Sequence, residues 1–278
     1  MTSNVHPIGV FDSGYGGLTV LREFVKTMPQ YDFLYLGDNA RTPYGTRSFD
    51  VVYEYTLQAV NELFNRGCQL VILACNTASA KALRTIQQRD LPLISAEKRV
   101  LGVIRPSVEY AAKYTRSGHV GVLATSGTVA SKSYPIELEK WSEGRVKVTT
   151  QQACPMWVPI VENQEIGTTG AEYFVERDMK RLFEQDPKID TLILGCTHYP
   201  LLIDSIRNYL PNRKVEVVEQ GKIVAESLVD YLYRHPEIDR NCTKGGMVDY
   251  LTTEQVELFE PRASLFMNKE VKARKVHL

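Results

Sequence analysis

Two cysteines occupy matching positions in the two halves of the sequence. Cys75 follows the apolar run at residues 70–74, and Cys196 follows a similar run at residues 192–195. A free thiol titrates near about 8.5, so modest stabilisation of its anion makes it a usable base. Two thiols on opposite sides of one carbon could remove a proton from one face and deliver a proton to the other. The pair therefore suggests inversion of a stereocentre.

Each cysteine also has a simpler interpretation, because free cysteine is among the most buried residue types. The polar segment at residues 76–80 predicts the first turn of a helix directly after Cys75, and a helix dipole favours a thiolate there. His198 follows Cys196 by two residues and could pair with the thiol or with substrate, although a lone histidine is more often structural. A cysteine beside a histidine also fits a nucleophilic hydrolase. A hydrolase, however, has no use for a second, matching cysteine.

Three loops could bind a small polar ligand. Residues 12–17, with the sequence DSGYGG, lack the glycine spacing of a dinucleotide-binding turn, and the sequence contains no phosphate loop. This turn, with Asp12, suits an ammonium group, unless Asp12 is only a helix cap. Residues 125–128, with the sequence TSGT, could hold a carboxylate through hydrogen bonds. Residues 43–45 could present backbone amides, although such loops are usually only turns.

Short β-branched runs alternate with longer amphipathic segments along the chain. This alternation predicts an α/β protein in which strands of mostly parallel sheets are joined by crossover helices. The expected strands are residues 8–11, 33–36, 70–74, 120–124, 146–150, 192–195 and 215–218. The expected helices include residues 48–65, 171–184 and 221–233.

Two segments of the first half recur in the second half in the same order. Residues 8–14 resemble residues 120–127, and residues 71–77 resemble residues 192–198. We therefore expect two similar α/β domains related by pseudo-twofold symmetry, with the active site in the interdomain cleft. The polar residues of all four segments follow the carboxyl ends of strands, where open α/β sheets bind ligands.

The predicted domains are discontinuous in the sequence. Residues 1–100 and 211–278 form the first domain, to which the chain returns from residue 215 onward. Residues 101–210 form the second domain. The length of 278 residues and the hydrophobic content of 44% agree with one or two folded domains.

Charge and cysteine usage limit the possible partners. Lys plus Arg and Asp plus Glu both number 33, so the net charge favours neither nucleic acid nor an anionic membrane. The sequence shows no signal peptide and no apolar run of about 20 residues, so we expect a cytoplasmic protein. Its five cysteines lack a C-x-x-C pair, which predicts reduced thiols and no zinc ribbon.

At these motifs the chain resembles glutamate racemase, within the aspartate/glutamate racemase superfamily. The matching segments span most of the chain in the family's order; they are residues 11–17, 36–38, 43–45, 74–80, 124–128, 153–155 with Glu162, and 195–200. Aspartate racemases share the fold and the paired cysteines but differ around the first glycine turn. The Asp-Ser-Gly sequence at that turn favours glutamate as the substrate.

The resemblance implies interconversion of L- and D-glutamate without cofactor or metal, supplying D-glutamate for peptidoglycan. Cys75 would act on D-glutamate and Cys196 on L-glutamate, while Asp12, His198 and Glu162 assist proton transfer. The residues that would hold substrate are Asp12, Ser13, Pro43, Tyr44, Gly45, Asn76, Thr77, Thr125, Thr128, Thr197 and His198. We expect a homodimer that binds glutamate and neither nucleic acid nor membrane.

Two segments depart from the family's pattern. Residues 218–221 read Val-Glu-Gln-Gly where Val-Asp-Ser-Gly is expected, and residues 95–101 carry additional charged residues. These departures affect local packing, subunit contacts or regulation rather than the reaction. Three other interpretations stay open: an isomerase with another substrate, a hydrolase or transferase with one essential cysteine, and a two-domain binding protein without catalysis.

Overall fold

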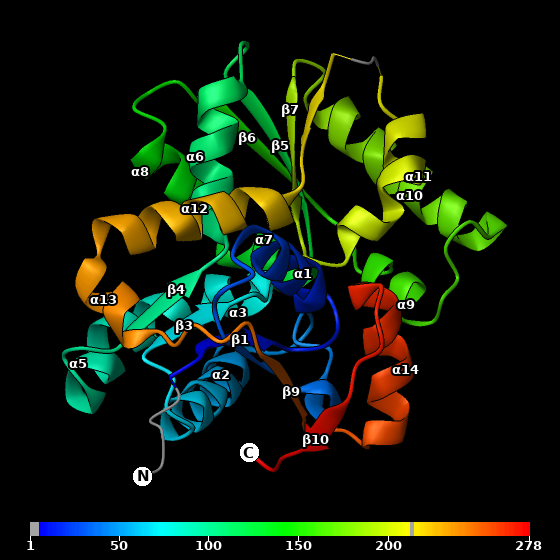
Figure 1. The fold of residues 1–278 in the computed structure, drawn as a ribbon. Helices are drawn as coiled ribbons and strands as arrows, with labels where there is room; N and C mark the ends of the chain where they lie inside the picture. The colour runs from blue at the N-terminus through cyan, green and yellow to red at the C-terminus, as the bar shows by residue number, and fades with distance from the viewer. Residues whose placement is uncertain (1–5, 212–213) are drawn as a thin grey trace, which may run out of the picture.

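The computed structural model describes residues 6–211 and 214–278, and within them it contains two parallel β-sheets (Figure 1). The larger sheet has six strands in the order β10-β9-β2-β1-β3-β4, and the smaller has four in the order β6-β5-β7-β8. The strands are β1 (Ile8–Asp12), β2 (Phe33–Gly37), β3 (Leu70–Leu73), β4 (Arg99–Gly102), β5 (His119–Ala124), β6 (Val148–Ala153), β7 (Thr191–Gly195), β8 (Glu216–Val218), β9 (Val248–Thr252) and β10 (Ala273–Lys275). This architecture confirms the predicted α/β class.

Helices connect most of these strands and cover both faces of each sheet. They are α1 (Gly17–Thr27), η1 (Asn39–Arg41), α2 (Phe49–Asn65), α3 (Asn76–Lys81), α4 (Leu83–Thr85), η2 (Ile86–Asp90), α5 (Leu91–Ile94), α6 (Ile104–Tyr114), α7 (Ser126–Ser131), α8 (Ser133–Trp141), α9 (Trp157–Glu162), α10 (Thr169–Gln185), η3 (Tyr199–Leu202), α11 (Ile203–Asn208), α12 (Gln220–Arg234), α13 (Pro236–Asn241) and α14 (Val256–Met267). Ser48 and Thr168 begin the two longest helices, α2 and α10, as side-chain N-caps.

The two sheets repeat one pattern of strand order. In the larger sheet β2-β1-β3-β4 are neighbours, and in the smaller sheet β6-β5-β7-β8 have the equivalent order, with every pair parallel. The strands that precede the two cysteines, β3 and β7, therefore occupy equivalent places beside the central strands β1 and β5. This agrees with the prediction of two similar halves from the repeated segments.

Strand pairing corrects the expected path of the chain. We expected residues from 215 onward to return to the first half, but β8 pairs with β7 and so extends the smaller sheet. The chain rejoins the larger sheet only at β9, which pairs with β2. Where the chain first passes from the larger sheet to the smaller one, β4 still belongs to the larger sheet and runs to residue 102, just beyond the expected boundary at residue 100. The remaining division into domains stays a prediction.

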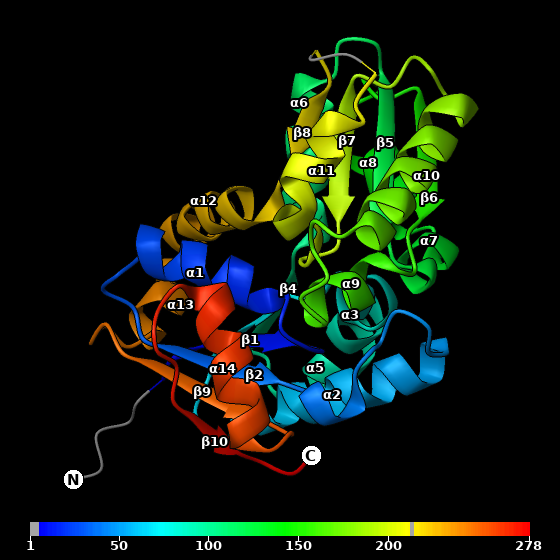
Figure 2. The ribbon, with the colours of Figure 1, turned by 90° about the vertical axis from the view of Figure 1, so that its right-hand side faces the viewer.

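Alternating side chains of each strand enter different hydrophobic clusters. Val10 of β1 packs in one cluster with Leu21 of α1, whereas the next residue, Phe11, packs in another with Val60 of α2. Strands buried on both faces are typical of parallel sheets. In the smaller sheet, α6 and α8 share a cluster with alternate residues of β5, and α10 lies in the cluster of the others. Figure 2 shows the two resulting lobes, with α1 and α12 side by side at their junction.

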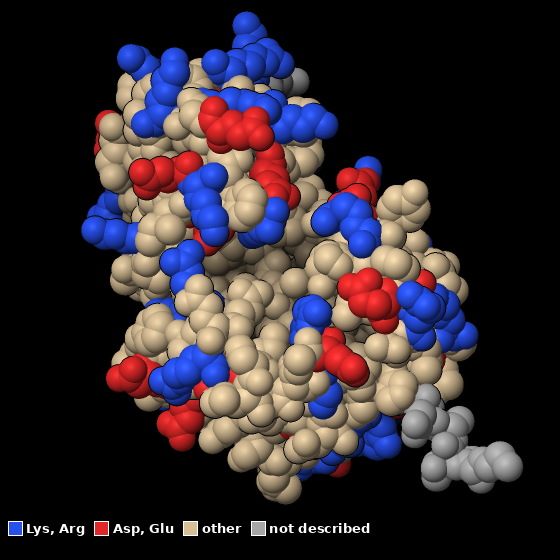
Figure 3. Space-filling view, turned by 90° about the vertical axis from the view of Figure 1, so that its left-hand side faces the viewer, with Lys and Arg blue, Asp and Glu red and all other residues tan. Residues whose placement is uncertain are grey.

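The surface carries both signs of charge without a large region of one sign on the face drawn in Figure 3, where a hollow lies between the lobes. Among the residues described, no helix is long and apolar enough to cross a membrane.

Candidate active site

Cys75 lies at the junction of β3 and α3 as the N-cap residue of that helix. Its Sγ accepts a weak hydrogen bond from the backbone N–H of Ala78 at 3.4 Å. The hydroxyl of Ser13 lies 3.3 Å from the same sulfur. The structure thus brings the thiol to the start of a helix, as the polar segment after Cys75 predicts, and adds a second possible hydrogen-bond partner from the first glycine turn.

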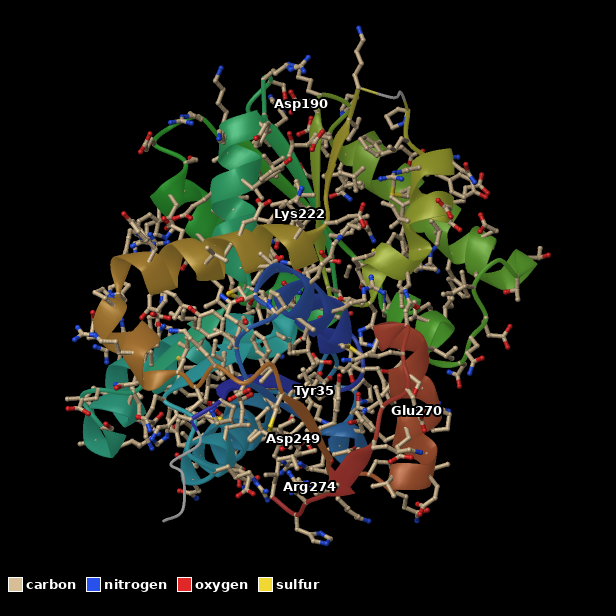
Figure 4. The ribbon with its side chains drawn as sticks, viewed as in Figure 1. Tyr35, Asp190, Lys222, Asp249, Glu270 and Arg274 are labelled. Carbon is tan, nitrogen blue, oxygen red and sulfur yellow. The ribbon has the colours of Figure 1, made fainter. Side chains whose placement is uncertain are left out.

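Backbone N–H groups of the first glycine turn, residues 12–17, bind the carboxylate of Asp12. Asp12 Oδ2 accepts hydrogen bonds from the backbone N–H groups of Gly14 at 3.1 Å and Gly17 at 2.9 Å. Tyr35 of β2, labelled in Figure 4, supports the turn from below by donating its hydroxyl hydrogen bond to the carbonyl of Gly14 at 2.9 Å. Close packing demands a glycine at residue 16, where a Cβ would lie only 2.4 Å from the ring of His198.

Cys196 follows β7 and lies beside a histidine–carboxylate pair. The Sγ of Cys196 is 3.7 Å from Nδ1 of His198, and the opposite ring nitrogen, Nε2, is 3.0 Å from Oε1 of Glu162. Glu162 is the last residue of α9, whereas Cys196 and His198 both lie in the loop between β7 and η3, so two segments of the smaller lobe form this group. The arrangement forms a path along which a proton can move between Cys196 and Glu162.

Burial and neighbouring charges set the protonation of this site. Burial alone would lower the pKa of His198, but its hydrogen bonds to Cys196 and Glu162 outweigh that effect and raise the pKa to about 10. Burial, with the nearby carboxylate of Asp12, raises the pKa of the Cys75 thiol to about 12. At neutral pH, Cys75 is therefore a thiol, while His198 is an imidazolium beside Cys196.

Asp12 lies between the two thiol environments. Burial raises the pKa of Asp12, and the charge on His198 together with the backbone N–H groups of Gly17 and Gly14 opposes this increase. The charge on Cys196 also contributes to the raised pKa of Cys75. The two cysteines are thus electrostatically coupled across the junction between the lobes.

Three threonine hydroxyls meet near Cys75. The hydroxyl of Thr77 lies 3.0 Å from that of Thr125 and 3.3 Å from that of Thr128, and Thr125 donates to Thr128 at 3.1 Å. Thr125 is also the N-cap of α7. All three hydroxyls are buried, so this hydroxyl cluster is fit to hold a carboxylate group that replaces some of these internal hydrogen bonds.

The loop at residues 43–45 packs against this hydroxyl cluster. The backbone N–H of Gly127 donates to the carbonyl of Gly45 at 2.7 Å, which joins the loop to α7. The phenol of Tyr44 is directed away to Asp38, to which it donates a hydrogen bond, and Pro43 is exposed. Of this loop, only backbone groups of Tyr44 and Gly45 are therefore suitably placed to meet a substrate.

Other residues that sequence reasoning did not identify support the site. Thr19 of α1 donates a hydrogen bond at 3.0 Å to the carbonyl of Thr197, which ties the loop after Cys196 to the larger lobe. Gln220 and Tyr134 hold the side chain of Asn76 through buried hydrogen bonds. These residues lie outside the strand-end motifs, and the unusual Gln220 in the segment at 218–221 was the only available signal.

The thiols are enclosed but not sealed. Cys75 and Cys196 each retain 6% exposure, close to the 5% of Cys242, whereas Cys68 and Cys154 have 0%. A surface cavity of about 610 Å³ lies elsewhere, at the junction of α1, α6 and α12, where Lys222 is labelled in Figure 4. Among the described residues, no cluster of His, Cys, Asp and Glu side chains could hold a metal ion. The side chains gathered at the site are thiols, an imidazole and carboxylates, all of which can transfer protons.

Comparison with known proteins agrees with this chemistry. Residues 8–228 match the family described as Asp/Glu/Hydantoin racemase. A glutamate racemase of Ruegeria sp. (strain TM1040) is 41% identical over 274 residues, covering 95% of this chain and 97% of the relative.

Two solved structures are similar over almost their whole length. A glutamate racemase isoform from Bacillus anthracis has a TM-score of 0.88 at 33% identity and covers 98% of each chain. A glutamate racemase from Francisella tularensis, solved in complex with D-glutamate, has a TM-score of 0.85 at 28% identity. It covers 99% of this chain and 98% of the other.

Proposed function

The chain belongs to the Asp/Glu/Hydantoin racemase family and has glutamate racemase activity, and from this premise we propose that Cys75 and Cys196 are its two acid/base groups. The D-glutamate serves peptidoglycan synthesis, as it does across the family. One observation carries the assignment. Two thiols follow equivalent strands of the two sheets, and each has its own hydrogen-bonding partners.

In the proposed reaction of L-glutamate, Cys196 is the base and Cys75 is the acid. Cys196, acting as the thiolate beside the ring of His198, removes the α-hydrogen as a proton from one face. The Cys75 thiol delivers a proton to the other face, which leaves Cys196 as the thiol and Cys75 as the thiolate. D-Glutamate reacts through the same steps in reverse. The pKa of Cys75, about 12, opposes its ionisation, and the ammonium group of bound substrate favours the thiolate.

The carbanion formed between these steps needs stabilisation by prearranged hydrogen-bond donors. Our candidates around the α-carboxylate are the buried hydroxyls of Thr77 and Thr197 and one N–H group of the Asn76 amide. The other N–H group of that amide donates to Gln220. Thr125, Thr128 and the backbone of the loop at 43–45 extend this lining. Asp12 and Ser13 complete the proposed binding set beside Cys75, with Asp12 facing the substrate's ammonium group.

Serine substitutions test the two-base assignment, because a hydroxyl is a much weaker acid and base than a thiol. We expect Cys75→Ser and Cys196→Ser each to lower racemisation by at least about 100-fold. In deuterated water, Cys75→Ser should still exchange the α-hydrogen of L-glutamate, and Cys196→Ser that of D-glutamate. Polarimetry measures racemisation, and proton NMR measures exchange.

Cys242→Ser is the matched control. Cys242 is buried at the C-terminal end of α13, where its Sγ donates to the carbonyl of Ile238. Replacement of this thiol should therefore leave racemisation unchanged. Near-normal racemisation by either active-site variant would refute the two-base mechanism. Loss of activity in only one of them would favour the hydrolase-like alternative with one essential cysteine.

We also propose that the enzyme works in the cytoplasm as a homodimer. Thiol acid/base chemistry needs reduced cysteines, which the cytoplasm maintains. The exposed apolar side chains of Leu258 and Leu265 on α14 are consistent with a subunit contact. Light scattering coupled to size exclusion tests the dimer, and a monomer at micromolar concentration would contradict it.

A further inference from the structure

The side-chain amide of Asn76 is held by residues that follow or precede the strands of the smaller sheet. Asn76 Nδ2 donates to Gln220 Oε1 at 2.6 Å, and Asn76 Oδ1 accepts from the hydroxyl of Tyr134 at 2.7 Å and from Gln220 Nε2 at 3.2 Å. Asn76 is the first residue of α3, directly after Cys75, while Gln220 begins α12 directly after β8 and Tyr134 lies in α8. All three side chains are buried.

Ser107 of α6 determines the orientation of the Gln220 amide. The hydroxyl of Ser107 donates its one hydrogen to the carbonyl of Val103 at 3.0 Å, so its oxygen can only accept from Gln220 Nε2 at 2.8 Å. Gln220 must then direct Oε1 toward Asn76, and Asn76 must donate an N–H group to that oxygen. A flipped Asn76 amide would place its NH₂ group against the NH₂ group of Gln220 and its oxygen against the oxygen of Gln220.

These contacts leave one donor of Asn76 free for a substrate. Asn76 Oδ1 accepts from the hydroxyl of Tyr134, while Gln220 Nε2 at 3.2 Å is shared with nearer acceptors, Ser107 at 2.8 Å and Tyr134 at 3.0 Å. The NH₂ group of Asn76 has two hydrogens, and the described contacts use one. We propose that Gln220 is a positioning residue of this racemase, which fixes the Asn76 amide so that its second N–H group meets the substrate carboxylate beside Cys75. This inference rests on the proposed role of Asn76 in substrate binding.

Gln220 stands in the segment that departs from the family's pattern, at the place where a serine is expected. A serine carries one short hydroxyl and cannot form the reciprocal pair of amide hydrogen bonds that joins Gln220 to Asn76. The glutamine therefore gives this chain a connection from α6 through α12 to the first residue of α3.

Gln220→Met tests the inference, because methionine preserves the approximate size of glutamine and removes both amide groups. We expect the KM for L-glutamate and for D-glutamate each to rise about tenfold, the effect of losing one well-directed hydrogen bond to a charged group. The kcat should change by less than the KM. Gln87→Met is the matched control, since Gln87 makes a similar side-chain hydrogen bond to the carbonyl of Val100, outside the active site. Its KM should remain normal.

A double-mutant comparison separates positioning from general packing. Asn76→Ala should raise the KM by itself, and Gln220→Met should add nothing in the Asn76→Ala background. A normal KM in folded Gln220→Met, or a full tenfold rise on top of Asn76→Ala, would overturn the positioning role. If Asn76→Ala has a normal KM, the proposed role of Asn76 fails and the inference fails with it.

Ser107→Ala provides a second test if Gln220→Met does not fold. It removes the acceptor that orients Gln220 without touching Asn76. We expect a folded protein, by circular dichroism, with a KM raised about threefold for both enantiomers, a part of the effect of one hydrogen bond. An unchanged KM in this variant would overturn the proposal.

Discussion

Replacement of Glu162 by glutamine should shift the protonation of His198 without removing the histidine. Glu162 Oε1 lies 3.0 Å from Nε2 of His198, and their side chains are only 16% and 6% exposed. Little water is therefore available to screen the carboxylate from the imidazolium. Glutamine preserves the size of the side chain and a possible hydrogen bond, so the change removes mainly the negative charge.

The size of the effect follows from the hydrogen bond that is altered. The pKa of His198 lies at about 10 against an ordinary value of 6.5. A hydrogen bond to a charged group contributes about 1.5 to 3 kcal/mol, which corresponds to about 1 to 2 pKa units. We therefore expect a pKa of about 8 to 9 in Glu162→Gln, with the bond to Cys196 maintaining the rest of the increase.

The same shift predicts how stability depends on pH. Because the folded-state pKa of His198 is raised, the stabilisation from its protonation is fully present below about pH 6.5 and is lost as the pH rises through about 10. Glu162→Gln should therefore unfold more easily than the parent protein at pH 7. The two proteins should become similar in stability above about pH 10, where His198 is neutral in both.

Two measurements check the shift. Proton–carbon NMR of histidine-labelled protein should show one resonance, assigned with His198→Asn, whose midpoint moves to lower pH in Glu162→Gln. The alkaline limb of kcat/KM for L-glutamate should move in the same direction. Glu165→Gln, an exposed neighbour three residues away, should change neither. An unchanged midpoint in Glu162→Gln would refute the argument that this carboxylate maintains the imidazolium.

Three further predictions concern packing, cofactors and geometry. Gly16→Ala should lose about 1 to 3 kcal/mol of stability and much of its kcat, because the new Cβ would lie 2.4 Å from both His198 Nδ1 and Thr197 Oγ1. Gly170→Ala, whose nearest atom would be 3.9 Å away, should retain both, and calorimetry with polarimetry compares them. Chelated and dialysed protein should keep full racemase activity, and dependence on an added metal or pyridoxal phosphate would contradict this. A glutamate-bound crystal structure should place the Cys75 and Cys196 sulfurs roughly 6 to 7 Å apart, and a separation beyond about 10 Å would contradict the two-base reaction.

The alternation of strand-like and helical segments predicted most of the strands, including β6 and β8 at the edges of the smaller sheet. All seven expected strands occur within a few residues of their expected bounds. β4, β9 and β10 were missed. β4 and β10 lie at the edges of the larger sheet, and their sequences, RVLG and ARK, carry charged residues that a local pattern does not distinguish from a loop. β8 was recognised as a strand, but only its pairing with β7 reveals its sheet.

Some residues of the site could likewise be predicted from local sequence, and others could not. The sequence pattern identified Cys75, His198 and Asp12, because side chains that can transfer protons follow apolar strands at these positions. It did not identify Thr19 or Gln220, since each acts through a partner more than 140 residues away in the sequence. No local pattern contains such a contact. For Tyr44, the sequence predicted a role for backbone amides of the loop, and the fold directs its phenol to Asp38.

The repeated strand order explains where the thiols lie but not how they differ. β3 and β7 are equivalent strands, yet the chain after β3 begins a helix capped by Cys75, while the chain after β7 places His198 beside Cys196. A symmetric pair of thiols would have the same protonation in the resting enzyme, and one turnover requires one acid and one base. The carboxylate of Asp12 helps to raise the pKa of Cys75, whereas the neighbour of Cys196 is the imidazolium of His198. The duplicated fold thus supplies two equivalent positions, and the residues around them give the two thiols unequal surroundings, as the proposed pairing of one acid with one base requires.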